Sequence, residues 1–321
     1  MLESEKLWIN ASKEIVRAIR GKRSQVAFSR RIGYQSNVAA DWEGGYRFPT
    51  IAKVLHAMTR VGIDVTASFE AFHADSAPAF KVGLPKWFRT LKGRTSQGDI
   101  AQSAGYSRHQ VRRWLSGEAE PRLPQFLALI NALTGRAPDW VACFVDINQV
   151  PTLSTQYNTA RIAARLAYDQ PWSAAIRMII NSEGYKAKPT DDYLSQSLGV
   201  SISNLEAPID ALIQSGLAKR SGSRLIPLST FTSDLKGDAE DRRRLKAHWA
   251  QVAADRLAHP RSDDLVSLNL AILSKADLAR VRQLQRDYFR ELRNIIAASE
   301  PEESAVLVLM QVLSLTPETT E

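Results

Sequence analysis

Residues 96–121 read SQGDIAQSAGYSRHQVRRWLSGEAEP, and residues 24–49 read SQVAFSRRIGYQSNVAADWEGGYRFP. The two stretches align without a gap at an offset of 72 positions. Repetition at a fixed offset indicates a structural unit that occurs twice in the chain. The identities include a Ser-Gln, a Gly-Tyr, a tryptophan, a glycine and a proline: Ser24/Ser96, Gln25/Gln97, Gly33/Gly105, Tyr34/Tyr106, Trp42/Trp114, Gly45/Gly117 and Pro49/Pro121.

Each copy has the pattern of short helices separated by glycines. In the second copy, Ser96 and Ser107 are candidate N-caps, because their hydroxyls can accept from the first free amides of a helix. Gly105 and Gly117 suit the left-handed backbone that ends a helix. Apolar residues recur at helical spacing between these positions. Two helices joined by a short turn containing glycine form the helix-turn-helix pattern.

The second copy resembles the Cro/phage-repressor-type (XRE-like) helix-turn-helix in the run SQ…A…GYSRHQVRRWLSGEAEP. That family shows a polar-Gln start to its second helix, a glycine turn, a recognition helix, and then glycine and proline. The first copy departs at Ser29, where a small apolar residue is usual, and at Asp41, on the exposed side of the recognition helix. The resemblance implies a DNA-binding fold.

By this resemblance, the recognition helix of the second copy lies in the major groove, and its first side chains reach base edges. Arginine there can pair bidentately with guanine, and the start of the preceding helix holds a phosphate. The alternative for this arginine cluster is a solvated helix face. The expected contacts are Ser107, Arg108, His109, Arg112 and Arg113 with bases, and Gln97, Arg94, Lys92 and Arg122 with phosphates.

The equivalent positions of the first copy are less basic. Asparagine and glutamine can pair with adenine, whereas Asp41 would repel phosphate unless it accepts from a cytosine amino group. The first copy is therefore either a reader of A·T-rich sequence or a copy repurposed for protein contacts. Its candidate contacts with DNA are Gln25, Gln35, Ser36, Asn37 and Arg47.

Four aromatic residues flank the turns of the two copies. Trp42 and Trp114 lie at apolar positions and are expected in the core. Tyr34 and Tyr106 directly follow the turn glycines. Their rings either touch the sugar-phosphate backbone or pack over the turn.

The distribution of charge agrees with a polyanionic partner for the first half. Residues 1–150 hold 21 Lys and Arg against 13 Asp and Glu, a difference of +8 that equals the net charge of the whole chain. The remaining residues are balanced. A concentrated positive charge favours nucleic acid as the partner, and the alternative is a basic domain that is merely soluble.

The second half predicts a different organisation. Two helices and a hairpin at residues 217–228 have a winged-helix-like order. Alternating apolar residues predict strands at 265–273 and 305–315, around a long helix capped by Ser274. This order resembles a C-terminal region of unknown function that follows helix-turn-helix modules in a group of bacterial regulator-like proteins. The resemblance implies a regulatory or oligomerising domain.

Composition argues against several other classes of protein. The longest apolar run, residues 305–310, is far shorter than the roughly 18 residues that cross a bilayer. The acidic start MLESEKLW is unlike a secretory signal, and one cysteine, Cys143, excludes a disulfide framework. The five histidines lack metal-ligand spacing, and no nucleotide-binding or nucleophile motif occurs. We therefore expect a cytoplasmic, nucleoid-associated protein with no membrane contact, cofactor, metal or enzymatic activity.

The predicted fold class is mainly α, with two tandem helix-turn-helix DNA-binding domains followed by a winged-helix-like and α+β C-terminal region. The functional hypothesis is a bacterial or phage transcriptional regulator, a repressor that forms a homodimer through residues 171–321 and binds repeated half-sites in double-stranded DNA. The alternative is an antitoxin or anti-defence adaptor whose C-terminal half binds a protein, and an effector is also left open. The predicted domains are 1–73, 74–147, a linker and connecting helix at 148–170, the winged-helix-like 171–232, and 233–321.

Overall fold

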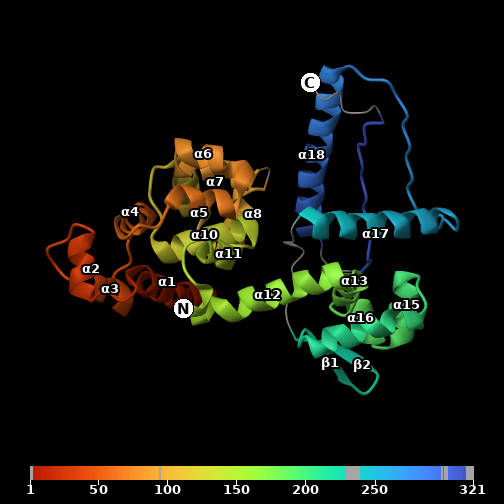
Figure 1. The fold of residues 1–321 in the computed structure, drawn as a ribbon, viewed down its shortest axis with the longest axis horizontal. Coiled ribbons are helices and arrows are strands. Elements are labelled where there is room, and N and C mark those ends of the chain that lie inside the picture. The colour runs from red at the N-terminus through yellow and green to blue at the C-terminus, as the bar shows by residue number, and fades with distance from the viewer. Residues whose placement is uncertain (1–2, 94, 229–238, 298, 300–302, 316–321) are drawn as a thin grey trace. The chain divides into compact units, whose positions relative to one another are not determined.

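The computed structural model describes residues 3–93, 95–228, 239–297, 299 and 303–315. This part of the chain is mainly helical and contains one two-stranded antiparallel sheet (Figure 1). The chain divides into two compact units, Met1–Asn158 and Thr159–Glu321. The helix α12 (Pro151–Asp169) extends across this division.

The first unit holds two sets of five helices in the same order. The first repeat consists of α1 (Glu3–Arg20), α2 (Gln25–Arg31), α3 (Val38–Gly44), α4 (Ile51–Val61) and α5 (Val65–Phe72). After η1 (Ala74–Ser76) and α6 (Ala77–Val82), the second repeat consists of α7 (Leu84–Lys92), α8 (Gln97–Ala104), α9 (Arg108–Ser116), α10 (Leu123–Thr134) and α11 (Ala137–Ala142). The single turn η2 (Ile147–Gln149) leads into α12.

The local geometry of the two repeats follows the sequence alignment. Ser24 and Ser96 cap α2 and α8 through their hydroxyls. Gly45 and Gly117 end α3 and α9 in the left-handed conformation, with φ of 82° and 86°. Ser107 caps α9 and Gly105 ends α8 in the same way, so the caps and helix ends predicted for the second copy are confirmed.

The aromatic residues near the turns pack inside the repeats. Trp42 and Trp114 are buried, as predicted. The ring of Tyr34 meets that of Trp42 edge to face, with centroids 5.9 Å apart, and Tyr106 meets Trp114 in the same way at 5.1 Å. The tyrosines thus pack over the turns, which was one of the two alternatives.

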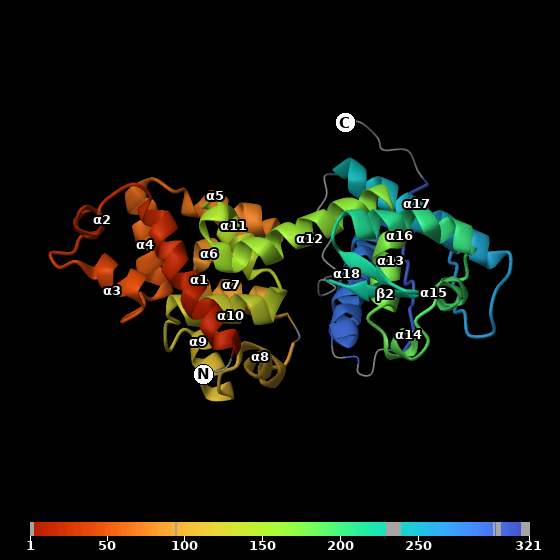
Figure 2. The ribbon, with the colours of Figure 1, turned by 90° about the horizontal axis from the view of Figure 1, so that it is seen from below.

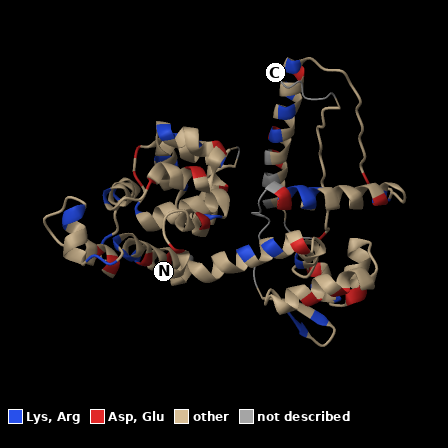
Figure 3. Cartoon of the chain, viewed as in Figure 1, with Lys and Arg blue, Asp and Glu red and all other residues tan. Residues whose placement is uncertain are grey.

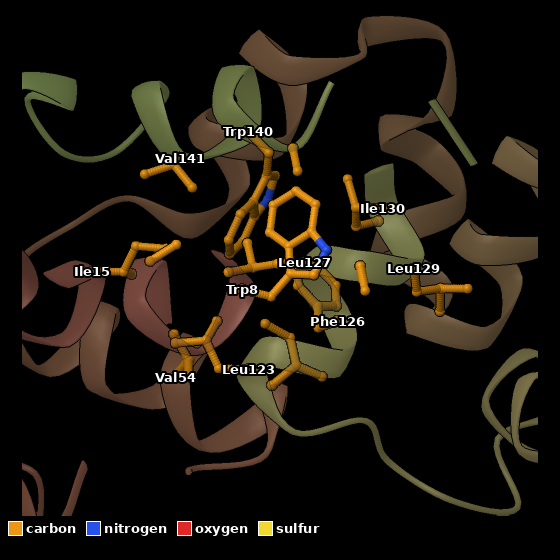
Figure 4. Close-up of a cluster of buried hydrophobic side chains, with 14 of the residues drawn as sticks. Trp8, Ile15, Val54, Leu123, Phe126, Leu127, Leu129, Ile130, Trp140 and Val141 are labelled. Atoms are coloured by element: carbon orange, nitrogen blue, oxygen red, sulfur yellow. The ribbon is translucent and has the colours of Figure 1, made fainter. Parts of the chain in front are cut away.

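The two repeats share one hydrophobic core. Side chains from α1 and α4 meet side chains from α10 and α11 (Figure 4). Trp87 on α7 is completely buried, and its ring lies 4.7 Å from that of Phe69 on α5 and 6.3 Å from that of Phe126 on α10. The sequence predicted a boundary between residues 73 and 74, whereas the packing makes residues 1–158 a single compact unit.

After the end of α12, the second unit continues with four helices and a hairpin around a smaller core. The indole ring of Trp172 meets the imidazole ring of His248 and the indole ring of Trp249 edge to face. The hydroxyl of Tyr185 accepts from the Leu225 amide at 2.9 Å. Helix-helix-hairpin order agrees with the sequence pattern. The elements are α13 (Trp172–Ile179), α14 (Glu183–Ala187), α15 (Asp191–Leu198), α16 (Ile202–Gln214), β1 (Ala218–Ser221), β2 (Arg224–Pro227), α17 (Ala239–Leu257) and α18 (Lys275–Ala297).

The predicted strands at 265–273 and 305–315 are wrong. Both stretches are extended, but neither pairs with another strand in the described structure. Leu268 and Leu270 are 90% and 83% exposed. Alternation gives a chain the pattern of a strand, yet a strand also needs hydrogen bonds to a neighbouring edge, and the described residues form none with these stretches. The described part of 233–321 is therefore helical and extended rather than α+β.

Candidate nucleic-acid interface

Of α3 and α9, the two helices at the predicted recognition positions, α9 has the more basic exposed surface. Its inward side is apolar and buried (Val111, Trp114 and Leu115), which fixes the orientation of the helix. Its other side exposes the predicted residues Arg108, His109, Arg112 and Arg113.

The start of α9 is held by a capping box. The Ser107 hydroxyl accepts from the Gln110 amide at 3.2 Å, and the Ser107 amide donates to the Gln110 side chain at 3.2 Å. These bonds satisfy two groups that a helix end leaves free. Ser107 therefore orients α9, and its hydroxyl is already used within the chain.

A hollow of about 390 Å³ lies beside this surface, between α7, the start of α8, and α9. Its cationic lining comes from Arg89, Lys92 and Arg112, and the predicted phosphate ligand Gln97 lies at its edge at the start of α8. Among the residues that the structure describes, no acidic side chain lines this hollow. A helix start with free amides, next to three cations, is suited to an anion of phosphate size.

Arg112 has one acidic neighbour outside the hollow. Its guanidinium lies 3.3 Å from the carboxylate of Glu118, and the two side chains are 54% and 48% exposed. An ion pair this exposed contributes less than about 1 kcal/mol. A phosphate can therefore compete with Glu118 for Arg112.

The corresponding place in the first repeat is filled by a carboxylate. In the alignment, the residues that line the hollow correspond to residues 72 positions earlier. Leu115 corresponds to Glu43, and Arg89, Lys92 and Gln97 correspond to Arg17, Arg20 and Gln25. Arg20 donates to both oxygens of Glu43, at 2.5 and 3.2 Å, and Gln25 donates to it at 3.0 Å. The Nε of Arg17 lies 3.7 Å from the Oε2 of Glu43. The first repeat thus neutralises its own cations.

The electrostatics of Glu43 reflect this arrangement. Burial acts to raise the pKa of Glu43, but the hydrogen bonds from Arg20 and Gln25 and the two arginine charges outweigh it. The pKa therefore lies below its ordinary value of 4.5. Sequence reasoning missed this ion pair. The alignment did contain a signal, since an acidic residue, Glu43, aligns with the apolar Leu115 among otherwise similar neighbours.

The remaining predicted contacts of the first repeat lie at the start of α3. Gln35, Ser36 and Asn37 are exposed there, and so is Arg47 after the helix. Ser29, the departure from the family pattern, is buried, and its hydroxyl accepts from the Ala39 amide at 3.1 Å. This serine therefore satisfies a free amide of α3 that a small apolar residue would leave without that partner.

Two substitutions at equivalent positions distinguish these two places. Arg20→Ala is expected to lower the free energy of unfolding by up to about 3 kcal/mol, because it leaves a buried carboxylate without its main partner. Lys92→Ala is expected to leave stability unchanged and to lower the salt dependence of DNA binding by about one unit of slope. Chemical unfolding and duplex titrations at several salt concentrations measure both effects. Equal losses of stability in the two variants would contradict the view that Arg20 pairs with a buried carboxylate and Lys92 does not.

The pH dependence of stability gives a separate test of Glu43. Because its pKa is lower in the folded protein, the carboxylate stabilises the fold above pH 4.5, and this contribution is lost as the pH falls through the folded pKa. Glu43→Gln should therefore be less stable than wild type at pH 7, and the difference should shrink below about pH 4.5. Urea unfolding of both proteins between pH 3 and pH 7 measures it. A difference that stays constant with pH would show that Glu43 is not held as a carboxylate.

Comparison with protein-family models, with curated proteins and with solved structures finds no match to this chain. In the residues that the structure describes, none of the helices is long and apolar enough to cross a membrane. The described side chains also include no group of three His, Cys, Asp or Glu that could hold a metal ion. Arg94, a predicted phosphate contact, lies outside the described residues.

Proposed function

We propose that this chain is a sequence-specific transcriptional regulator that binds double-stranded DNA through tandem Cro-type helix-turn-helix modules. The observation that carries the proposal is the contrast between the repeats. In the described part of the chain, the second repeat has an exposed basic helix beside a cationic hollow that no carboxylate lines, whereas the first repeat fills the same place with Glu43. A cation cluster whose ion pair, between Arg112 and Glu118, is exposed and weak favours an external anion.

In this proposal the side chains have separate tasks. Lys92, Arg89 and Gln97 hold a phosphate at the start of α8, which fixes the depth of α9 in the major groove. Arg108 and His109, at the first turn of α9, then face base edges. Arg112 lies on α9 at the edge of the hollow, where its guanidinium can donate hydrogen bonds to a phosphate or to a base. The phosphate contacts give affinity that depends on salt, and the base contacts give specificity.

The experiment that tests this proposal is capture of fragmented genomic DNA by the purified full-length protein at about 150 mM salt, followed by sequencing. A sharp motif near promoters is the expected result, and it would support repression by occlusion of the promoter. Broad enrichment that disappears as salt rises would reduce the interaction to nonspecific electrostatics. That result would overturn the proposal.

We propose in addition that the second unit forms a homodimer. Its extended stretches at 265–273 and 303–315 expose Leu268, Leu270, Leu313 and other apolar side chains. Exposed apolar side chains on unpaired extended backbone are typical of a surface that another chain covers. Charge gathers elsewhere in this unit, on the β1–β2 hairpin and along α18 (Figure 3).

Leu268→Lys with Leu270→Lys should convert a dimer to a monomer, because two charges would be placed on the covered surface. Sedimentation of the full-length protein measures the mass, and Lys219→Glu with Arg243→Glu, on exposed positions elsewhere in the unit, is the control. A wild-type monomer would contradict the homodimer. Such a result would favour the second candidate function, an adaptor in which this surface binds a different protein.

A further inference from the structure

The two repeats are joined at a bridge that pairs equivalent residues. The Ile51 amide donates to the Pro121 carbonyl at 3.0 Å, and the Leu123 amide donates to the Pro49 carbonyl at 2.9 Å. Between these bonds, Thr50 and Arg122 form an isolated antiparallel bridge. Pro49 and Pro121, Thr50 and Arg122, and Ile51 and Leu123 are each 72 positions apart. Each hydrogen bond is therefore the image of the other under a two-fold rotation.

The helices that follow the bridge continue the same relation. α4 begins at Ile51 and α10 at Leu123, and these two equivalent helices contact each other. The equivalent helices α5 and α11 also contact each other. Contacts between like elements are what a two-fold axis produces, whereas a translated tandem array would join unlike surfaces. The bridge and helices α4, α5, α10 and α11 are thus related by a two-fold axis, whereas α1 packs on α10 without an equivalent contact of similar extent between α7 and α4.

This symmetry governs how the two recognition positions meet a duplex. Figure 2 shows α2 and α3 at one corner of the first unit, and α8 and α9 at another. The strands of a DNA duplex are also related by two-fold axes, so a two-fold protein dimer binds two half-sites in inverted orientation. A single chain of this protein carries both recognition positions within one compact unit.

The two half-sites cannot have the same sequence, because the two recognition positions carry different side chains. α9 offers Arg108, which suits guanine, with His109 beside it. The start of α3 offers Gln35, which suits adenine, and Asn37, whose side-chain oxygen also accepts from the Ser29 hydroxyl at 3.3 Å. We infer that one chain binds a composite DNA site made of two dissimilar half-sites in inverted orientation, one guanine-containing and one adenine-containing. This inference rests on the proposed function.

The experiment is selection of bound duplexes from a random double-stranded library by the full-length protein. The expected consensus has two dissimilar halves, inverted and separated by about one helical turn, roughly 10 base pairs, or a multiple of it. Arg108→Ala with His109→Ala should remove sequence information from one half only. Gln35→Ala with Asn37→Ala should remove it from the other half only. Arg243→Ala with Arg280→Ala, both exposed on the second unit, should leave both halves unchanged.

The possible failures are distinguishable. A consensus with a single half-site, or with two halves in direct orientation, would overturn the inference and leave DNA recognition itself intact. Two identical inverted halves would show that both came from the same repeat of two chains, and would also overturn it. No enriched sequence at all would overturn the proposed function together with the inference.

Discussion

Arg108→Ala combined with Arg112→Ala is expected to weaken binding to the selected duplex by about 2–6 kcal/mol, roughly 30-fold to 10⁴-fold. Arg108 stands at the first turn of α9, where a guanidinium can pair with a guanine at about 1–3 kcal/mol. Arg112 lines the hollow and supplies a second charged contact of similar size. Its exposed bond to Glu118 offsets little of this loss.

The measurement is a fluorescence anisotropy titration with the selected duplex and with an unrelated duplex at one salt concentration. The unrelated duplex should lose much less affinity than the selected one, since only phosphate attraction holds it. Arg243→Ala with Arg280→Ala removes two exposed arginines that, like Arg112, each have one acidic partner, and it should bind as wild type does. If the α9 variant still binds the selected duplex normally, α9 is not the recognition helix.

Trp87→Ala is expected to destabilise both repeats together by about 3–5 kcal/mol. The side chain is completely buried, and its indole donates to the Ser76 hydroxyl at 2.8 Å. Its ring contacts Phe69 from the first repeat and Phe126 from the second. A single cavity there removes packing from both sides of the shared core.

Hydrogen–deuterium exchange resolved by peptide measures this prediction. Amides of α4 and of α10 should lose protection by similar factors in the Trp87 variant, although only α10 belongs to the same repeat as Trp87. Tyr46→Ala removes an aromatic ring that is 84% exposed and should change neither. Loss of protection confined to the second repeat would mean that the repeats fold independently, as the boundary predicted from sequence implies.

Much of the helical framework could be predicted because helix ends depend on near neighbours. Ser96, Gly105, Ser107 and Gly117 act within one turn of the positions they cap, so their pattern in the sequence already contains the interaction. The hairpin at β1 and β2 was predictable for the same reason. The strands at 265–273 and 305–315 were not, since a strand is completed only by another edge.

The candidate site divides in the same way. The exposed face of α9 follows from helical periodicity, and the structure places Arg108, His109, Arg112 and Arg113 on that face. The neutralising role of Glu43 does not follow from periodicity. It requires Arg20, Gln25 and Glu43 to converge from three helices, and convergence depends on the packing angles between those helices.

Three properties follow from the amino-acid sequence alone: the chain is mainly helical, one unit occurs twice, and positive charge gathers in the half that contains both copies. These properties are sums over residues or local patterns, so they need no knowledge of the fold. Three other properties depend on the three-dimensional fold: the copies share a core, they meet through equivalent residues around Thr50 and Arg122, and one cation cluster surrounds a buried carboxylate whereas its counterpart has, among the described residues, only the exposed pair of Arg112 with Glu118. Each of these depends on contacts between residues far apart in the chain, which hydrophobic burial brings together only when the whole unit folds.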